Sequence, residues 1–164
     1  MNQHHQRKPT LKDDELDPSL SDVSRTVIGS AIEIHKALGP GFDRSVYENA
    51  LSVELKAQSV RHAVNHEFPV QYKDQRVGSH RVSLYVDDRF AVQVLAEDRD
   101  VSGFDRDAMR AQLRAAGLDL GLIINFNRRR LRDGLVRVLN PDRIDSIRGG
   151  RHDDEHDDYE DDER

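Results

Sequence analysis

The chain has 164 residues, no cysteine and a formal net charge of −6. This length suits one domain with a substantial core, and the lack of cysteine excludes disulfides and cysteine-ligated zinc and gives no sign of an oxidising compartment. The polar residues 1–12 do not resemble a signal peptide, and no apolar run approaches the roughly 20 residues that a membrane span needs. We therefore expect a cytoplasmic protein with no membrane partner.

The two ends of the chain differ in composition from the middle. Residues 1–20 show little apolar spacing, and residues 151–164 hold nine acidic residues against two arginines, a net charge of −7. Because the whole chain carries −6, the first 150 residues carry only +1 and attract polyanions weakly. Neither end can bury enough apolar surface to offset the entropy of ordering. We predict a disordered segment over 1–20, a folded domain over 21–147 and an acidic disordered tail over 148–164.

Two helices open the predicted domain. Apolar residues recur at three- and four-residue spacing over residues 23–38, which predicts an amphipathic helix that Ser21-Asp22 caps and Gly39 ends. His35 falls on its apolar face, where we expect a packed, hydrogen-bonded histidine. A second helix is predicted over residues 45–58.

A hairpin follows the helices. Residues 68–72 alternate between apolar and polar, residues 73–76 resemble a turn, and residues 77–86 again read as extended. Asp87-Asp88 is ordinary turn chemistry and returns the chain toward a third strand.

The third strand begins the second half of the domain. Residues 90–96 are apolar on both faces, which is typical of a central strand. A helix over 106–116 and strands over 120–126 and 135–139 complete the order α-α-β-β-β-α-β-β. That order predicts an α/β fold in which a mixed central sheet is flanked by helices.

Three stretches carry a resemblance to a known family: residues 27–42, with their helix and glycine turn, residues 45–51, and residues 117–126. Together they resemble the GxxExxY family of the PD-(D/E)xK nuclease superfamily over roughly residues 23–138. A long match in fixed order is more specific than a short motif. The resemblance implies a restriction-endonuclease-like core.

The resemblance also implies an active site. Active members are expected to carry a glutamate on the second helix, an aspartate on the middle strand of the hairpin and a glutamate-x-lysine pair on the next strand. Mg²⁺ prefers such anionic oxygens, and the bound ion activates water. The matching positions here hold Arg44, Ser83, Gln93 and Leu95, and the supporting glutamine and tyrosine of the later helix match Ala108 and Gln112.

These replacements argue against a metal. Hydroxyl and amide oxygens bind Mg²⁺ too weakly without a carboxylate, and a cation such as Arg44 would repel the ion by about 1 to 4 kcal/mol at contact distance. We therefore predict a pseudo-nuclease with no catalytic residue, no metal ligand and no cofactor.

Two alternatives stay open. Glu97, with its neighbours in 97–100, could supply displaced carboxylates to a metal-dependent DNA or RNA nuclease, although a solvated strand end is the simpler interpretation. The dense basic group Arg128, Arg129, Arg130 and Arg132 could contact a phosphate backbone in a non-catalytic nucleic-acid binder, or be a solvated loop. We expect His4-His5 and the spaced pair His152 and His156 to face solvent.

The favoured function is a non-catalytic structural or binding module. Its simplest partner is another copy of the chain, because a mixed sheet has edges that can pair and because basic and acidic segments are separated along the sequence. Nucleic-acid binding is the less favoured alternative.

Overall fold

The computed structural model describes residues 17–143. Predictions for residues 1–16 and 144–164, including the acidic tail, lie outside the described residues. The elements are the helices α1 (Pro18–Leu38), α2 (Arg44–Ala57) and α3 (Gly103–Ala116), the strands β1 (His62–Tyr72), β2 (Gln75–Val86), β3 (Phe90–Leu95), β4 (Leu120–Asn125) and β5 (Leu135–Leu139), and the short 3₁₀ helices η2 (Leu131–Gly134) and η3 (Pro141–Arg143). The predicted order of the longer elements is confirmed.

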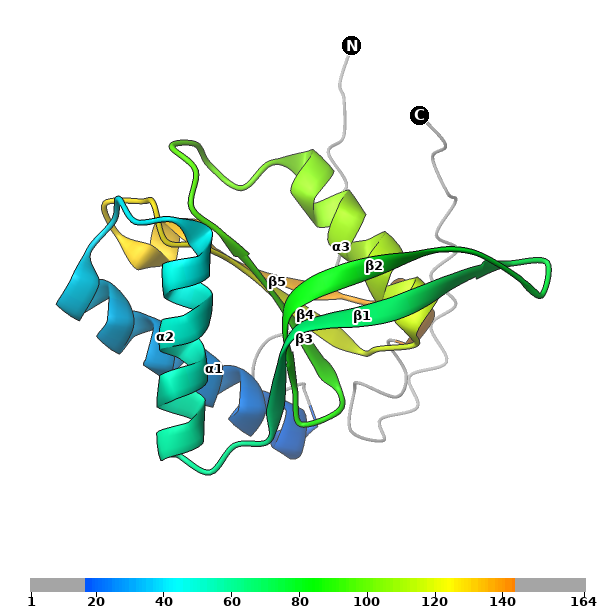
Figure 1. Cartoon of the computed structure of the whole chain (residues 1–164), viewed down its shortest axis with the longest axis horizontal. Helices are drawn as coiled ribbons and strands as arrows, with labels where there is room; N and C mark the ends of the chain where they lie inside the picture. Colours follow the sequence, from blue (N-terminus) through cyan, green and yellow to red (C-terminus); the bar gives the residue numbers. More distant parts are fainter. Residues whose placement is uncertain (1–16, 144–164) are drawn as a thin grey trace, which may run out of the picture.

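One mixed sheet forms the centre of the fold. Its strands lie in the order β1-β2-β3-β4-β5, with β3 and β4 parallel and the other neighbours antiparallel. Helices α1 and α2 cover one face, and α3 covers the other (Figure 1). Strand β3 is central, as its two-sided apolar pattern predicted. Within the described residues, no helix combines the length and the apolar character that crossing a membrane requires.

Helix α1 begins five residues earlier, and α3 three residues earlier, than their apolar periodicity predicted. The side chain of Asp17 accepts a hydrogen bond from the Ser19 amide and caps α1 at Pro18, and Leu20 is fully buried. Residues 18–20, which we had placed before the domain, are therefore part of its first helix. Helix α3 begins at Gly103 because Ser102 and Asp105 form a reciprocal capping box.

The β1–β2 hairpin reaches well beyond the helices that cover the sheet (Figure 1). Its last buried apolar residue is Phe68, and from residue 71 to residue 79 every residue is exposed. The turn consists of Lys73 and Asp74, both in the left-handed region, and not of the four residues predicted. We call residues 69–79 the arm.

Candidate functional site

Strand β2 leaves the sheet where the resemblance places the catalytic aspartate. β2 pairs with β3 only from Leu84↔Val92 to Val86↔Phe90, whereas β3 stays paired with β4 as far as Leu95. At the point of divergence, the Ser83 hydroxyl accepts a hydrogen bond from the Val94 amide at 3.0 Å. The serine side chain thus satisfies a backbone donor that has lost its partner strand.

A cavity of about 170 Å³ lies between β3 and α3. Its lining includes four of the positions matched through the family resemblance, and the full set is Gln93, Leu95, Asp105, Ala108, Met109, Gln112 and Ile123. The amide oxygens of Gln93 and Gln112 are both buried and have no hydrogen-bond partner within residues 17–143. The lining therefore combines two neutral amides with apolar side chains and the carboxylate of Asp105.

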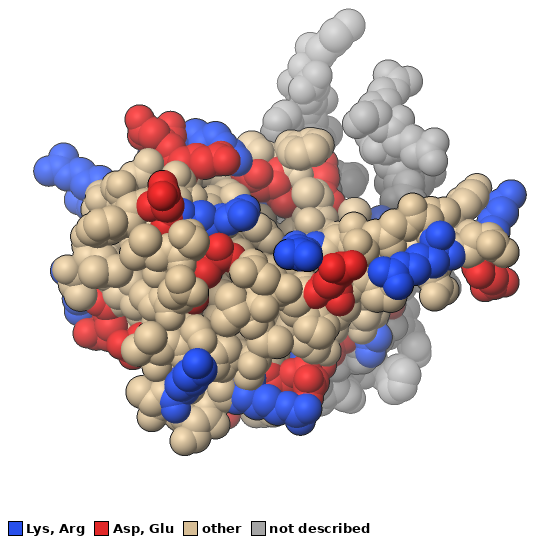
Figure 2. Space-filling model, in the orientation of Figure 1, with Lys and Arg blue, Asp and Glu red and all other residues tan. Residues whose placement is uncertain are grey.

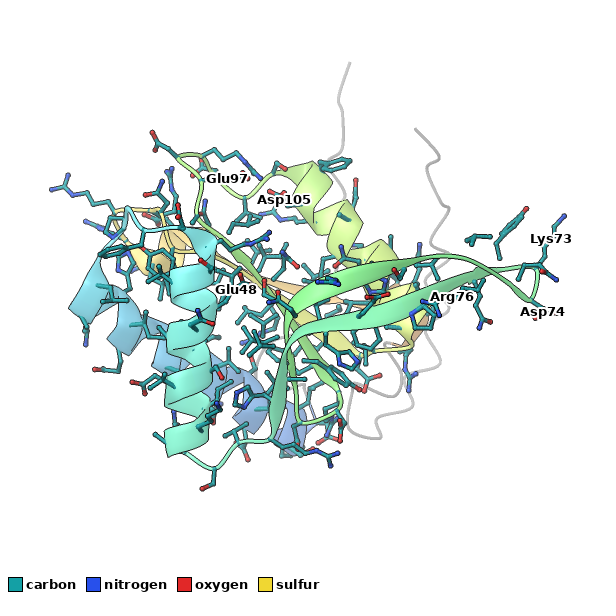
Figure 3. The ribbon with its side chains drawn as sticks, viewed as in Figure 1. Glu48, Lys73, Asp74, Arg76, Glu97 and Asp105 are labelled. Atoms are coloured by element: carbon teal, nitrogen blue, oxygen red, sulfur yellow. The ribbon has the colours of Figure 1, made fainter. Side chains whose placement is uncertain are left out.

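The arginine that replaces the expected glutamate neutralises a neighbouring acid. Arg44 opens α2, and its Nε lies 3.4 Å from the carboxylate of Glu48, whose side chain is only 6% exposed. Figure 3 shows Glu48 on α2, well separated from Glu97 and Asp105 near the start of α3. A buried carboxylate one turn along α2 therefore already has a cationic partner.

Tyr47, the tyrosine of the GxxExxY motif, has a structural role. It is fully buried and stacks on Phe126, with ring centroids 4.4 Å apart. Its hydroxyl donates to the Gly39 carbonyl at 2.6 Å and accepts from the Phe42 amide at 3.2 Å. These bonds hold the glycine turn between α1 and α2.

The acids near the end of β3 are also neutralised. The side chain of Glu97 is 55% exposed and pairs with Arg99. The same guanidinium bonds Asp105 at 2.6 Å and holds the pKa of that carboxyl at about 2, well below its ordinary value. Glu97 and Asp105 thus share one arginine instead of presenting free anionic oxygens.

A buried asparagine organises the segment that carries these acids. Asn125, fully buried at the end of β4, donates to the carbonyls of Glu97 at 2.9 Å and Arg99 at 2.7 Å. Its amide oxygen accepts from the backbone of Glu97 and of Asn127. One side chain therefore holds both the backbone that follows β3 and the backbone that follows β4.

In the basic group formed by Arg128, Arg129, Arg130 and Arg132, the first residue is held in place by other parts of the fold. The Arg128 side chain lies 2.9 Å from Asp100, and its carbonyl accepts a bond from the His35 ring at 2.8 Å, so the packed, hydrogen-bonded His35 is confirmed. The following residues of the group are exposed and have no ion-pair partner within residues 17–143; they are Arg129, Arg130 and Arg132. Figure 2 shows acidic and basic side chains interspersed on the face in view, without an extended area of one sign.

The comparison with protein families agrees with this architecture. The sequence model for the PD-(D/E)XK nuclease superfamily matches residues 21–138, from α1 into β5. The chain belongs to the PD-(D/E)XK nuclease superfamily. No curated protein and no solved structure is significantly similar to it. The superfamily part of the predicted resemblance is confirmed, and membership of the GxxExxY branch stays a prediction.

A PD-(D/E)XK nuclease would need a set of anionic oxygens for its metal, and the residues found here do not fit that need. Within residues 17–143, no three or more histidine, cysteine or acidic side chains are grouped so that they could hold an ion. The Ser83 hydroxyl is occupied by Val94, and Asp105 is occupied by Arg99. The remaining oxygens in the cavity are neutral amides, which are weak ligands for Mg²⁺.

Sequence reasoning found part of this PD-(D/E)XK site. The structure brings Gln93 and Leu95 together with both α3 positions in one cavity, whereas Ser83 and Arg44 do not line it. Glu48 and Asn125 were not among the site residues predicted from the sequence. The four-residue spacing from Arg44 could have indicated the first, and a polar residue within an apolar strand could have indicated the second.

Proposed function

We propose that this PD-(D/E)XK domain is catalytically silent and acts as a self-associating structural or binding module. One observation carries the proposal: the cavity between β3 and α3 is lined by two neutral amides, apolar side chains and a single carboxylate that an arginine already holds. The superfamily scaffold is present, and the charges that metal-dependent hydrolysis requires are lacking at these positions.

The chemistry supports this interpretation. In metal-dependent phosphodiester hydrolysis, the ion lowers the pKa of water and stabilises negative charge on the phosphorus oxygens. A divalent ion leaves water only for anionic ligands in a suitable array. The oxygens of Gln93 and Gln112 provide no charge, and an ion that recruited Asp105 would have to displace Arg99 first.

A nuclease with migrated ligands finds less support. Glu97, the acid proposed to replace the lost ligands, is half exposed and paired with Arg99. The nucleic-acid alternative rests on the exposed Arg129, Arg130 and Arg132 alone, because Arg128 is held by Asp100 and the visible surface mixes both signs of charge. Neither alternative has geometry that favours it over a binding module.

Self-association is supported by the open edges of the sheet. β5 ends the strand order on one side, and the arm carries β1 and β2 away from the body with large apolar side chains exposed. Such features are typical of surfaces that pair with another chain.

Calorimetric titration with Mn²⁺, together with plasmid nicking, tests the loss of catalysis. The wild-type protein should bind no Mn²⁺ in the micromolar range and should leave the plasmid intact. A restored variant carrying Arg44→Glu, Ser83→Asp, Gln93→Glu and Leu95→Lys should gain affinity for Mn²⁺. Nicking by the wild-type protein that Glu97→Ala abolishes would overturn the proposal in favour of migrated ligands.

Light scattering coupled to size-exclusion chromatography tests the self-association. The wild-type protein should have a mass above that of one chain, and the mass should increase with concentration. A particle that remains a single chain at the highest soluble concentration would contradict this part of the proposal.

A further inference from the structure

We infer that the outer edge of β2 pairs antiparallel with the same edge of a second copy, so that two arms form one four-stranded sheet. This inference rests on the proposed self-association and names the surface that mediates it. Figure 1 shows why the surface is accessible: beyond the divergence from β3, the hairpin stands apart from the other strands.

The backbone of β2 has a free side along the arm. β1 pairs with one side of β2 from Gln75 to Val86, whereas β3 covers the other side only from Leu84 to Val86. Within residues 17–143, no backbone hydrogen bond joins residues 75–83 to any element except β1. In this stretch, the backbone groups that point away from β1 are therefore open to strand addition, with one bulge at Val77, which has no partner on β1.

The opposite edge of the hairpin is blocked. On β1, Asn65 lies in the left-handed region and interrupts the pairing, and Pro69 has no amide hydrogen. Proline fits an edge strand where its missing N–H would face solvent. Its partner across the hairpin is Ser79, so the N–H and carbonyl of Ser79 point away from β1, toward the free side of β2.

The arm exposes apolar side chains that a partner could bury. Tyr72 is 64% exposed and Val77 is 62% exposed, and neither belongs to an apolar cluster of the core. An isolated two-stranded ribbon is marginally stable in water, whereas three or more strands form a stable sheet. The turn and the lysine over the Tyr72 ring order the arm in advance, which lowers the entropic cost of association.

The charges of the arm favour a second copy over a polyanion. Arg76 and Arg81 each lie 3.6 Å from Glu67, and Lys73 is next to Asp74 at the tip (Figure 3). Residues 67–81 hold three basic and two acidic side chains, a net charge of only +1 with histidine neutral, so two arms can approach without strong repulsion. A nucleic acid would meet little net positive charge there.

The two-fold axis that relates two identical edges sets the register. An axis through Ser79 places this residue opposite its counterpart, and the regular pairing reaches on either side as far as Arg81 of one copy and the bulge at Val77 of the other. Arg76 and Arg81 then do not face one another, and the outward backbone groups of the two serines exchange hydrogen bonds. This register predicts which pair of residues can be cross-linked.

Two variants of the full chain test the pairing. Ser79→Pro removes an outward amide donor and should weaken the dimer by about tenfold or more in sedimentation velocity, with the melting temperature monitored as a check of the fold. Because the chain has no cysteine, Ser79→Cys introduces a single thiol that should form an interchain disulfide on mild oxidation. Val53→Cys, on the exposed face of α2, is the matched control and should form no interchain disulfide under the same oxidation.

The outcomes separate the two proposals. A wild-type chain that never associates would overturn the self-association on which the inference rests. A dimer that forms normally with Ser79→Pro, and that Ser79→Cys does not cross-link, would leave self-association standing and exclude this edge. If Ser79→Pro fails to fold, the disulfide alone decides: rapid cross-linking at residue 79 supports the edge, and cross-linking no faster than at residue 53 refutes it.

Discussion

The hydroxyl of Ser83 accepts a hydrogen bond from the Val94 amide across the point where β2 and β3 separate. Both residues are buried, so this amide has no access to water. A side chain at the position expected to bind a metal thus serves the backbone of the neighbouring strand. The contact links the loss of catalysis to the stability of the fold.

Ser83→Ala should lower the free energy of unfolding by about 1 to 3 kcal/mol, because it leaves the buried Val94 amide without an acceptor. Urea denaturation followed by circular dichroism measures the change. Ser83→Thr keeps the hydroxyl and should retain more of the stability. An alanine variant as stable as the wild type would show that the hydrogen bond contributes nothing.

Arg44 and Glu48 should behave as a coupled pair. Arg44→Ala should destabilise the fold by about 1 kcal/mol or more, because it leaves a buried carboxylate without its cation. Glu48→Gln should remove most of that penalty. A double-mutant cycle from denaturation curves measures the coupling, and additive effects of the two substitutions would contradict the pairing.

His80 should make stability depend on pH. Both ring nitrogens are buried without a hydrogen-bond partner within residues 17–143, and burial lowers the pKa of the imidazole. The unfolded chain then binds a proton more readily, so this contribution is fully present above about pH 6.5 and is lost as the pH falls below it. Denaturation of His80→Phe between mildly acidic and neutral pH should show a smaller loss than the wild type. An unchanged pH slope would exclude His80 as the source.

Asp105 should stabilise the fold over a lower pH range. Its pKa is held at about 2 by Arg99, below the value in the unfolded chain, so its contribution is complete above about pH 4 and is lost as the pH falls through about 2. Asp105→Ala should cost about 1 kcal/mol at neutral pH, since it also removes the capping box of α3. The difference from the wild type should shrink in acid-denaturation experiments. Arg99→Ala is the control that should reproduce the acid-dependent part.

Local patterns were sufficient for most of the fold. Helical spacing predicted α1, and the two-sided apolar run predicted β3 as a central strand, because each pattern reports how one element meets the core. The same reasoning missed the starts of α1 and α3. Those ends depend on hydrogen bonds that the side chains of Asp17 and Ser102 accept from backbone amides, and the apolar spacing alone does not contain them.

The residue types at the matched positions, Arg44, Ser83, Gln93 and Leu95, could be read from the chain alone, and so could the lack of cysteine and the unequal charge of the two ends. Folding determined that Ser83 meets the Val94 amide and that Asp105 meets Arg99. It also determined that β2 separates from β3 and so has a free edge along the arm. These relationships join residues whose proximity depends on where strands separate and how elements pack. Composition specifies which groups are present, and the long-range geometry of the sheet specifies which of them remain available.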